Sequence, residues 1–331
     1  MIKMKGLLLF IIVFVFSCQH ENTKISIEKR QIASTIDIEE MVFISNDTFL
    51  LCGGIRAEKG EIFRSCDAGA NWQKLYEGKD KLYSFYFFPD NNEAIAVGDC
   101  THVQKSFDRG ATWTKKIDCS YLWTNDRTSF RKISFYDGKG GIAIGNQSRE
   151  YGNAMFSWDR GDSWQDVQGN NGLNDWWIFN NDSLIAVGYG IVEKITHNWQ
   201  QGYRGYLPTV TVLPFSGDYF TGIWFTNNTV GYMSGFDGGI YKTKDAGIHW
   251  TEIYKRNSIL RNRIHFNDVL FESETVGWVS GQNGLLMKTT DAGHSWVKIK
   301  TNFSDNLKSL FYYNHTLYIS SENGNYFVIT E

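Results

Sequence analysis

The stretch Ser106-Phe107-Asp108-Arg109-Gly110-Ala111-Thr112-Trp113 decides the fold, because it recurs along the whole chain. Its pattern is Ser/Thr-x-Asp-x-Gly-x-x-Trp, and further copies occupy residues 65–72, 157–164, 243–250 and 289–296. A shortened copy without the glycine lies around Thr196-His197-Asn198-Trp199. A motif that returns at intervals indicates a repeat architecture, in which each repeat is one supersecondary unit.

Each full copy, called a box below, lies between two short apolar runs, and this predicts a strand, a tight turn and a second strand. The Asp is expected to bond backbone N–H groups of its own turn, and the Gly permits a positive φ. The Ser or Thr hydroxyl offers another local bond, and the Trp is large enough to fill a seam between sheets. Carboxylates on separate hairpins are not expected to meet in one catalytic or metal centre. We therefore predict structural roles for Asp67, Gly69, Trp72, Asp108, Gly110, Trp113, Asp159, Gly161, Trp164, Asp245, Gly247, Trp250, Asp291, Gly293 and Trp296.

The motif resembles the Asp-box, or bacterial neuraminidase repeat, of β-propellers. The longer run from Val276 to Gly293 resembles the repeat of the photosystem II assembly/stability factor family, and the run from Val230 to Trp250 is similar. The resemblance covers about residues 38–331. It implies a propeller that helps to assemble a membrane protein complex, although nothing in the sequence points to photosynthesis. Propellers of this kind serve unrelated activities, so the resemblance indicates the fold far better than the activity.

The spacing of the apolar runs predicts an all-β, seven-bladed propeller of four-stranded antiparallel blades, each with its box between the third and fourth strands. The first six blades are expected to start near Ile38, Leu82, Lys132, Trp176, Phe220 and Phe266. A seventh unit, from Ser309, lacks a box and ends one strand short. We expect residues 25–32 to supply that strand, so that an N-terminal strand joins the last blade and closes the ring without open edges. Second strands ending in Ala-Val-Gly suggest an interior in which small residues let sheets approach.

Composition adds a few bounds. The 331 residues carry a net charge of −3, with 16% aromatic residues and only 3 Pro. This suits many short strands and tight turns, and the balanced charge gives no sign of nucleic-acid binding. The sequence has no Gly-rich phosphate loop and no Cys-x-x-Cys spacing, so we expect neither a cofactor nor a metal. We expect a monomer.

The N-terminus is predicted to be a targeting segment. Lys3 and Lys5 precede an apolar run, Leu7 to Phe16, that is too short to span a bilayer. Ser17-Cys18 then resembles a bacterial lipobox, which implies cleavage before Cys18 and lipidation of that residue; an ordinary signal peptide with a chance cysteine is the alternative. We thus predict a signal peptide over 1–17, an anchor and tether over 18–30, and one propeller over 31–331. The protein would lie in the bacterial cell envelope, at the outer membrane, facing the periplasm or the surface, and would reach the membrane only through its anchor.

Four cysteines remain after Cys18. An exported compartment permits disulfides, and Cys100 with Cys119 is the pair we rank first, because both follow strands that should leave the same face. Cys52 lies within a strand pattern and is a core candidate. The sequence leaves the states of Cys52 and Cys66 open.

The loops expected opposite the boxes supply candidates for binding. They join second to third strands (B–C) and fourth to first strands of the next blade (D–A), and they are rich in the Arg and aromatic residues typical of binding hot spots. The candidates are Trp123, Arg127, Arg149, Tyr151, Trp176, Arg204, Tyr206, Arg261 and Arg263. We predict a non-catalytic module that binds a protein of a membrane complex through this face.

The alternative is a sialidase-like glycoside hydrolase or a glycan-binding protein. The shared box would imply three arginines for a carboxylate, a Tyr nucleophile with a Glu base, and an Asp acid/base. Loose matches are Arg131, Arg149, Arg204, Arg261, Glu150 and Tyr151. No Arg-Ile-Pro signature occurs, and the length allows one propeller, whereas a glycosidase cleft between two propellers needs both. Glycan capture by exposed Trp123 and Trp176 is a further form of this alternative.

Overall fold

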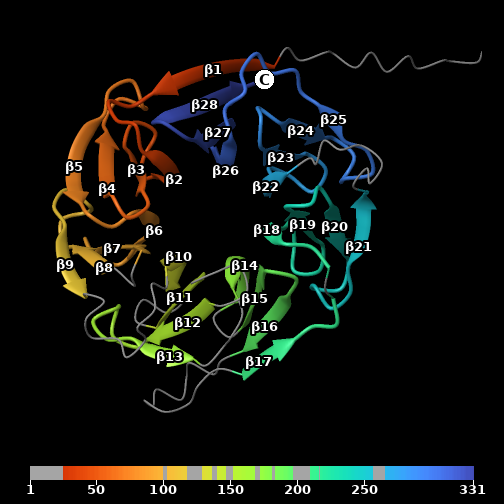
Figure 1. Ribbon diagram of the computed structural model, residues 1–331, viewed down its shortest axis with the longest axis horizontal. Helices are drawn as coiled ribbons and strands as arrows, with labels where there is room; N and C mark the ends of the chain where they lie inside the picture. Colours follow the sequence, from red (N-terminus) through yellow and green to blue (C-terminus); the bar gives the residue numbers. More distant parts are fainter. Residues whose placement is uncertain are drawn as a thin grey trace, which may run out of the picture.

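Seven four-stranded antiparallel sheets surround a central axis in the computed structural model (Figure 1). The structure describes residues 25–99, 103–117, 129–135, 140–146, 152–167, 172–180, 183–196, 209–215, 217–255 and 265–331. Every element in these ranges is a strand. The predicted seven-bladed propeller is therefore confirmed. No helix of the described residues is long and apolar enough to cross a bilayer.

The strands follow one another in blade order, from the inner strand A to the outer strand D. Blade one holds β2 (Asp37–Phe43), β3 (Phe49–Ile55), β4 (Lys59–Ser65) and β5 (Gln73–Gly78). Blade two holds β6 (Leu82–Phe87), β7 (Ala94–Gly98), β8 (Val103–Ser106) and β9 (Thr114–Ile117). Blade three holds β10 (Ser129–Phe135), β11 (Gly141–Asn146), β12 (Gly152–Ser157) and β13 (Gln165–Val167). Blade four holds β14 (Leu173–Asn180), β15 (Ser183–Gly188), β16 (Val192–Thr196) and β17 (Thr209–Val212).

The remaining blades complete the ring. Blade five holds β18 (Phe220–Phe225), β19 (Gly231–Gly235), β20 (Ile240–Thr243) and β21 (Thr251–Tyr254). Blade six holds β22 (Phe266–Phe271), β23 (Gly277–Gly281), β24 (Leu286–Thr289) and β25 (Val297–Lys298). Blade seven holds β26 (Leu307–Tyr313), β27 (Thr316–Ser321), β28 (Asn325–Thr330) and, as its outer strand, β1 (Ser26–Gln31).

The core lies between neighbouring blades. The B strands β7, β19 and β23 are buried along their whole length, because a blade covers each of their two faces. One core cluster joins Ile185 and Val187 of blade four to Phe220, Met233 and Trp250 of blade five. Side-chain exposure rises toward the outer strands. The residues of β5 and β17 are exposed or half-buried.

The N-terminal strand closes the ring as predicted. β1 pairs with β28 from Ser26 opposite Thr330 to Gln31 opposite Asn325, and it lies along the outside of blade seven (Figure 1). Residues 26–30, which the sequence led us to include in the tether, therefore belong to the propeller. Their pairing covers the edge of β28, which would otherwise expose unpaired backbone groups.

The glycines that end the B strands have a different reason from the one expected. Each neighbouring A strand carries a bulge at this height. A Cβ at Gly98 would lie 2.0 Å from the carbonyl oxygen of Lys81, and one at Gly188 would lie 1.8 Å from that of Gly172. The absence of a Cβ therefore leaves space for the backbone of the bulged strand in the same blade. They do not serve the approach of neighbouring blades.

Candidate functional site

Each box closes upon itself through the same hydrogen bonds. In the second box the Ser106 hydroxyl donates to Asp108 Oδ1 over 2.8 Å and accepts the N–H of Gly110 over 2.8 Å. Asp108 Oδ1 also accepts the N–H of Thr112 over 2.8 Å, and its Oδ2 accepts the Thr112 hydroxyl over 2.6 Å. The other four full boxes repeat the set, with Asn71, Ser163, His249 and Ser295 in the place of Thr112.

These bonds explain the acidity of the box carboxylates. Hydrogen bonds from the backbone and side chain of Asn71 lower the pKa of Asp67 to about 2. The backbone N–H of His249 lowers the pKa of Asp245 to about 2, and the Ser295 hydroxyl does the same for Asp291. Each carboxylate is thus engaged within its own hairpin.

The boxes also join each blade to the preceding one. Gly247 has a φ of 84°, and a Cβ there would lie 2.3 Å from Ile185 Cδ1 of blade four. In blade one the carbonyl of Gly69 accepts the hydroxyl of Tyr326, which belongs to blade seven, over 2.7 Å. The box glycine therefore provides both a left-handed backbone and space for the neighbouring blade.

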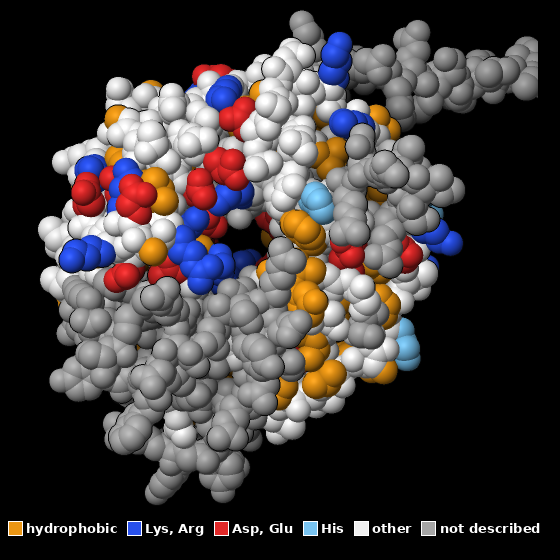
Figure 2. Space-filling model, viewed as in Figure 1, with side chains coloured by type: hydrophobic (Ala, Val, Ile, Leu, Met, Phe, Trp, Pro, Cys, Tyr) orange, Lys and Arg blue, Asp and Glu red, His pale blue; other side chains and the backbone are white. Residues whose placement is uncertain are grey.

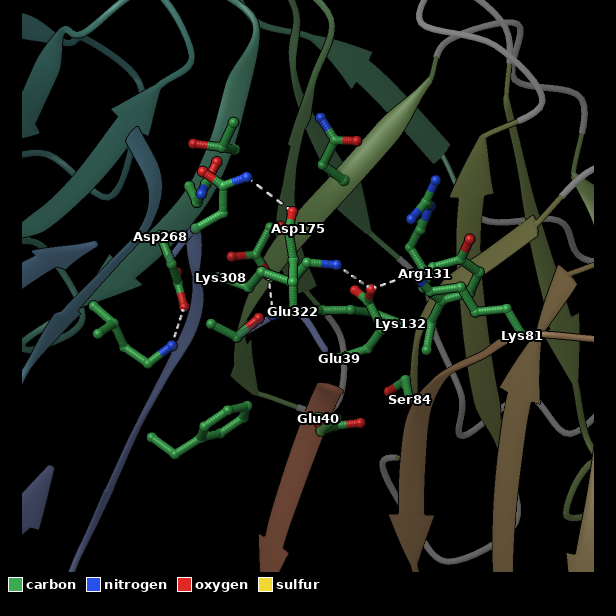
Figure 3. A pocket seen from close by; sticks show the side chains of 18 of the residues that line it. Glu39, Glu40, Lys81, Ser84, Arg131, Lys132, Asp175, Asp268, Lys308 and Glu322 are labelled. Carbon is green, nitrogen blue, oxygen red and sulfur yellow. Dashed lines mark hydrogen bonds and ion pairs between the residues drawn. The ribbon is translucent and has the colours of Figure 1, made fainter. Parts of the chain in front are cut away.

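A cavity of about 530 Å³ occupies the axis of the ring. The A strands of all seven blades line it, and charged side chains from separate blades converge there (Figure 3). The space-filling view shows its opening, with lysine, arginine and carboxylate side chains on one side and hydrophobic side chains on the other (Figure 2). We call this opening, with the surrounding B–C and D–A connections, the channel mouth.

Polar side chains at the bulges tie neighbouring A strands together around the channel. Each accepts a backbone N–H from the next blade. The pairs are Glu40 with Phe85 at 2.6 Å, Ser84 with Ile133 at 3.3 Å, Asp175 with Ile223 at 2.9 Å, and Asp268 with Leu310 at 2.8 Å. This belt uses three carboxylates and the Ser84 hydroxyl to accept backbone N–H groups at the bulges.

One side of the channel holds a compensated ionic network. Lys81 and Lys308 both contact Glu39, at 2.6 and 2.7 Å, and both contact Asp37, at 3.2 and 3.0 Å. Burial opposes the ionisation of Glu39, but Lys308 and Lys81 outweigh it and lower its pKa to about 2. These lysines are therefore already paired with acids of the same channel.

Asp268 has the opposite shift. Burial raises its pKa to about 7, and the charge of Asp175 adds to this effect, while Lys132 and the N–H of Leu310 reduce it. Asp175 itself forms an ion pair with Lys132. The channel thus contains a carboxyl group that changes charge near neutral pH, a property that general acids use.

Four aromatic side chains border the channel mouth over blades four to six, and we call them the aromatic ridge. Their successive ring centroids lie 5.8 Å apart from Tyr189 to Tyr219, 5.9 Å from Tyr219 to Phe236 and 4.1 Å from Phe236 to His265. They come from alternating B–C and D–A connections. His265 Nδ1 donates to the Phe236 carbonyl over 2.7 Å, which holds the last two rings together. Tyr219 also lines the channel, so ridge and cavity are continuous.

Two of the residues predicted for the binding face or for the sialidase alternative can be placed. Trp176 is only 8% exposed and packs in a core cluster with Ile144 and Phe156, so its proposed place on a binding surface is corrected. Its side chain points between blades because β14 is an inner strand with a blade on either side. Arg131, from the sialidase alternative, lies over the Tyr83 ring at 4.1 Å and lines the channel.

The other positions predicted for the binding face, the sialidase alternative, lipidation and the disulfide lie outside the described residues. They are Trp123, Arg127, Arg149, Glu150, Tyr151, Arg204, Tyr206, Arg261, Arg263, Cys18, Cys100 and Cys119. By strand order, residues 197–208 connect β16 to β17. In the blades that have a full box, the C–D connection carries it. Cys52 is buried and Cys66 is exposed, and both are free thiols.

The belt and the ridge were not predicted from the sequence. A signal for the belt exists, because Asn174-Asp175 and Asn267-Asp268 interrupt two otherwise apolar inner strands at the same height. The ridge has no such local signal, because its four members come from four separate connections. Among the described residues, no group of three His, Cys, Asp or Glu side chains is arranged to hold a metal ion.

Comparison with known proteins identifies the type of propeller. The family profile described as "Photosynthesis system II assembly factor YCF48" matches residues 210–307. The solved structure "YCF48 bound to D1 peptide" has a TM-score of 0.68 and 20% identity, over 92% of this chain and 97% of that one. YCF48 from Cyanidioschyzon merolae also scores 0.68, with 13% identity over 92% of this chain and 98% of that one.

A similar propeller fold also occurs in a protein of another type. The WD40 propeller domain of Doa1 has a TM-score of 0.66 and 11% identity, over 93% of this chain and 98% of that one. The sequence matches no curated protein at a significant level. Similarity at these identities shows the fold, and the repeat match shows a propeller like that of the photosystem II assembly factors, built from bacterial neuraminidase repeats.

Proposed function

We propose that this propeller is a lipid-anchored, non-catalytic binding module, which engages a protein of a membrane complex at the channel mouth. The observation that carries the proposal is the division of the mouth into a charged side and the aromatic ridge (Figure 2). The match to the assembly-factor repeat supports it, as does the solved YCF48 structure with a bound D1 peptide.

A polypeptide segment fits the chemistry of this mouth. The ridge offers ring edges and faces at varied angles, including 73° between Tyr219 and Phe236, which suit side chains better than a flat sugar ring. Next to it, Asn174, Asn267 and Gln282 line the cavity with side-chain amides. The Asn174 and Asn267 amides already donate to the Phe220 and Leu307 carbonyls. The Gln282 amide can pair with the backbone of an extended chain, while aromatic residues supply the anchoring contacts.

The box carboxylates support a structural role. Each is bonded to its own turn, and the five lie on five separate hairpins. The lipid anchor remains part of the proposal because it rests on the sequence around Cys18. An anchored wheel would hold the mouth close to membrane partners.

The proposal is tested by capture of membrane partners with full-length protein. Tyr189→Ser combined with Phe236→Ala should reduce crosslinked partner by about tenfold, since hot-spot aromatics contribute more than 1 kcal/mol each. Val212→Ser is the matched control, because Val212 is also an exposed apolar residue of blade four but lies on its outer strand. Equal capture by both variants would refute the mouth as the binding site.

A glycoside hydrolase is the second candidate, and one observation favours it. Asp268, whose pKa burial raises to about 7, lies in the same channel as Arg131 and as Asp175, the ion-pair partner of Lys132, so two carboxyl groups there have different surroundings. Fluorogenic sialosides and other aryl glycosides test it directly. Turnover that disappears in Asp268→Asn would replace the binding proposal.

A further inference from the structure

Most of the exposed large apolar side chains of the propeller lie at one rim. The box rim is the rim formed by the A–B turns and the C–D boxes, opposite the channel mouth. Within the described residues, six large apolar side chains are exposed. Ile44, Phe107 and Ile248 lie on the box rim, and Val297 begins β25 directly after the box of blade six. Ile248 and Val297 are 47% and 64% exposed and belong to adjacent blades, five and six.

The polarity of β1 places the N-terminal tether on this rim. β28 is a C strand, and a C strand ends where the box would begin. Ser26 pairs with Thr330 at that end, so β1 starts at the box rim and runs toward the channel mouth. Blade seven, which carries β1, is the neighbour of blade six.

The tether is short compared with the wheel. Seven residues lead from Cys18 to Ile25, and they reach at most about 25 Å. A six-residue strand is about 20 Å long, which approximates the distance from the box rim to the channel mouth. A lipidated Cys18 would therefore hold the box rim near the bilayer, and turning the mouth toward the lipid would use nearly the whole reach of the tether.

A groove beside these apolar side chains offers basic groups. It has a volume of about 490 Å³, lies between the boxes of blades five and six, and is lined by Lys242, Lys244, His249 and His294. Its one carboxylate, Asp245, is already bonded to His249 at 2.7 Å. The Lys242 ammonium donates to the Ala292 carbonyl over 2.8 Å and lies 5.0 Å from the centroid of the Tyr232 ring, whereas Lys244 is exposed.

We infer that the box rim of blades five and six docks on a phospholipid surface. Ile248 and Val297 enter the boundary between headgroups and acyl chains, and Lys242 and Lys244 contact lipid phosphates. Lipid is the expected occupant because the short tether from Cys18 holds this rim, rather than the channel mouth, near the bilayer. The channel mouth then faces away from the bilayer. This inference rests on the lipid anchor of the proposed function but not on its protein partner.

The test measures which face of the lipidated full chain meets the lipid. The protein is reconstituted into phosphatidylcholine vesicles that carry bromine on their acyl chains, with a fluorophore on Ile248→Cys or on Tyr189→Cys. Both variants also carry Cys66→Ser, which removes an exposed thiol of the box rim. We expect at least twofold quenching of the Ile248→Cys probe and none of the Tyr189→Cys probe. Equal quenching of the two, or quenching of neither, would overturn the inference.

Two further measurements test the phosphate contact and the lipid anchor separately. In vesicles with added phosphatidylglycerol, quenching should rise, and Lys244→Gln should abolish this rise without changing quenching in pure phosphatidylcholine. A rise that survives Lys244→Gln would overturn the phosphate contact. Mass spectrometry of the mature N-terminus shows separately whether Cys18 is acylated. An unmodified Cys18 with unaltered partner capture would refute the anchor and this inference while leaving the binding function in place.

Discussion

At the scale of single residues, glycines show two distinct constraints that lie close together in blade four. Gly188 has an ordinary backbone, but a Cβ there would lie 1.8 Å from the Gly172 carbonyl oxygen. Gly190 has a φ of 64°, yet the nearest atom to its Cβ position is 4.0 Å away. One glycine is required by space and the other by conformation.

This contrast predicts that Gly188→Ala is the more damaging change. Gly190→Ala should cost about 1 kcal/mol, the usual penalty for a left-handed residue with a Cβ. Gly188→Ala should cost about 3 kcal/mol or more, because a backbone carbonyl cannot move aside as a side chain can. Urea denaturation of the two variants checks the order. A larger loss for Gly190→Ala would show that the bulge in β14 yields easily.

The box aspartates predict sensitivity to acid. The pKa values of Asp67, Asp245 and Asp291 are about 2, below the value of about 3.9 in an unfolded chain. Their stabilisation is therefore complete above pH 4 and lost as the pH falls toward 2. Asp245→Asn should lower the melting temperature at pH 6 and make its fall between pH 4 and 2 shallower. Glu58→Gln, a change to an exposed carboxylate in a B–C turn, is the control and should leave the slope unaltered.

At the scale of elements, closure of the ring depends on β1, the N-terminal strand that completes the C-terminal blade. β1 forms six backbone pairs with β28, and Lys29 contacts Asp305 at 2.7 Å. Ile27 packs beside the core cluster of blades six and seven. Without β1, the β28 edge would be open to pairing with another chain.

Deletion of residues 19–31 should therefore destabilise the propeller and cause association. The lost hydrogen bonds contribute of the order of 3 kcal/mol or more, at roughly 0.5–1.5 kcal/mol each. Light scattering after size exclusion should show dimers or aggregates. Deletion of residues 19–24 alone is the control, because it leaves β1 in place. A monomer of unchanged melting temperature after the longer deletion would contradict the closure mechanism.

At the scale of the whole molecule, the channel belt and the boxes respond to pH in opposite directions. The folded pKa of Asp268 is about 7 and exceeds its unfolded value of about 3.9. Its contribution is therefore fully present below pH 4 and is lost as the pH rises through 7. The groups that face it are Asp175, Lys132 and the N–H groups of Val269 and Leu310. The opposite pH dependences of Asp268 and the box aspartates predict that the free energy of unfolding is greatest near pH 4 to 5.

We predict that the melting temperature falls from pH 5 to pH 8, and that Asp268→Asn makes this range flat. An amide has no charge to bury but keeps only one of the two oxygens that accept the N–H groups of Val269 and Leu310, so the variant should lose the pH dependence at some cost in stability. Scanning calorimetry from pH 4 to 8 measures both curves. An unchanged slope in Asp268→Asn would assign the pH dependence to another group.

The sequence by itself determined the architecture, because the box is a local device. Its Ser/Thr, Asp, Gly and Trp form a turn through contacts within eight residues, and five copies predict the blades wherever they recur. The strand missing from the last unit predicted β1, since a propeller must close.

Only the tertiary structure decided where a site could form. The channel belt joins Asp268 to Leu310 and Asp175 to Ile223, and the aromatic ridge gathers residues from Tyr189 to His265. Their chemistry arises from the closure of the ring, which no single repeat encodes. The sequence also did not show that Trp176 is buried, because its burial depends on the packing of neighbouring blades. Local turns are written in short stretches of sequence, whereas the charge, burial and neighbours of each side chain depend on which blades close around it.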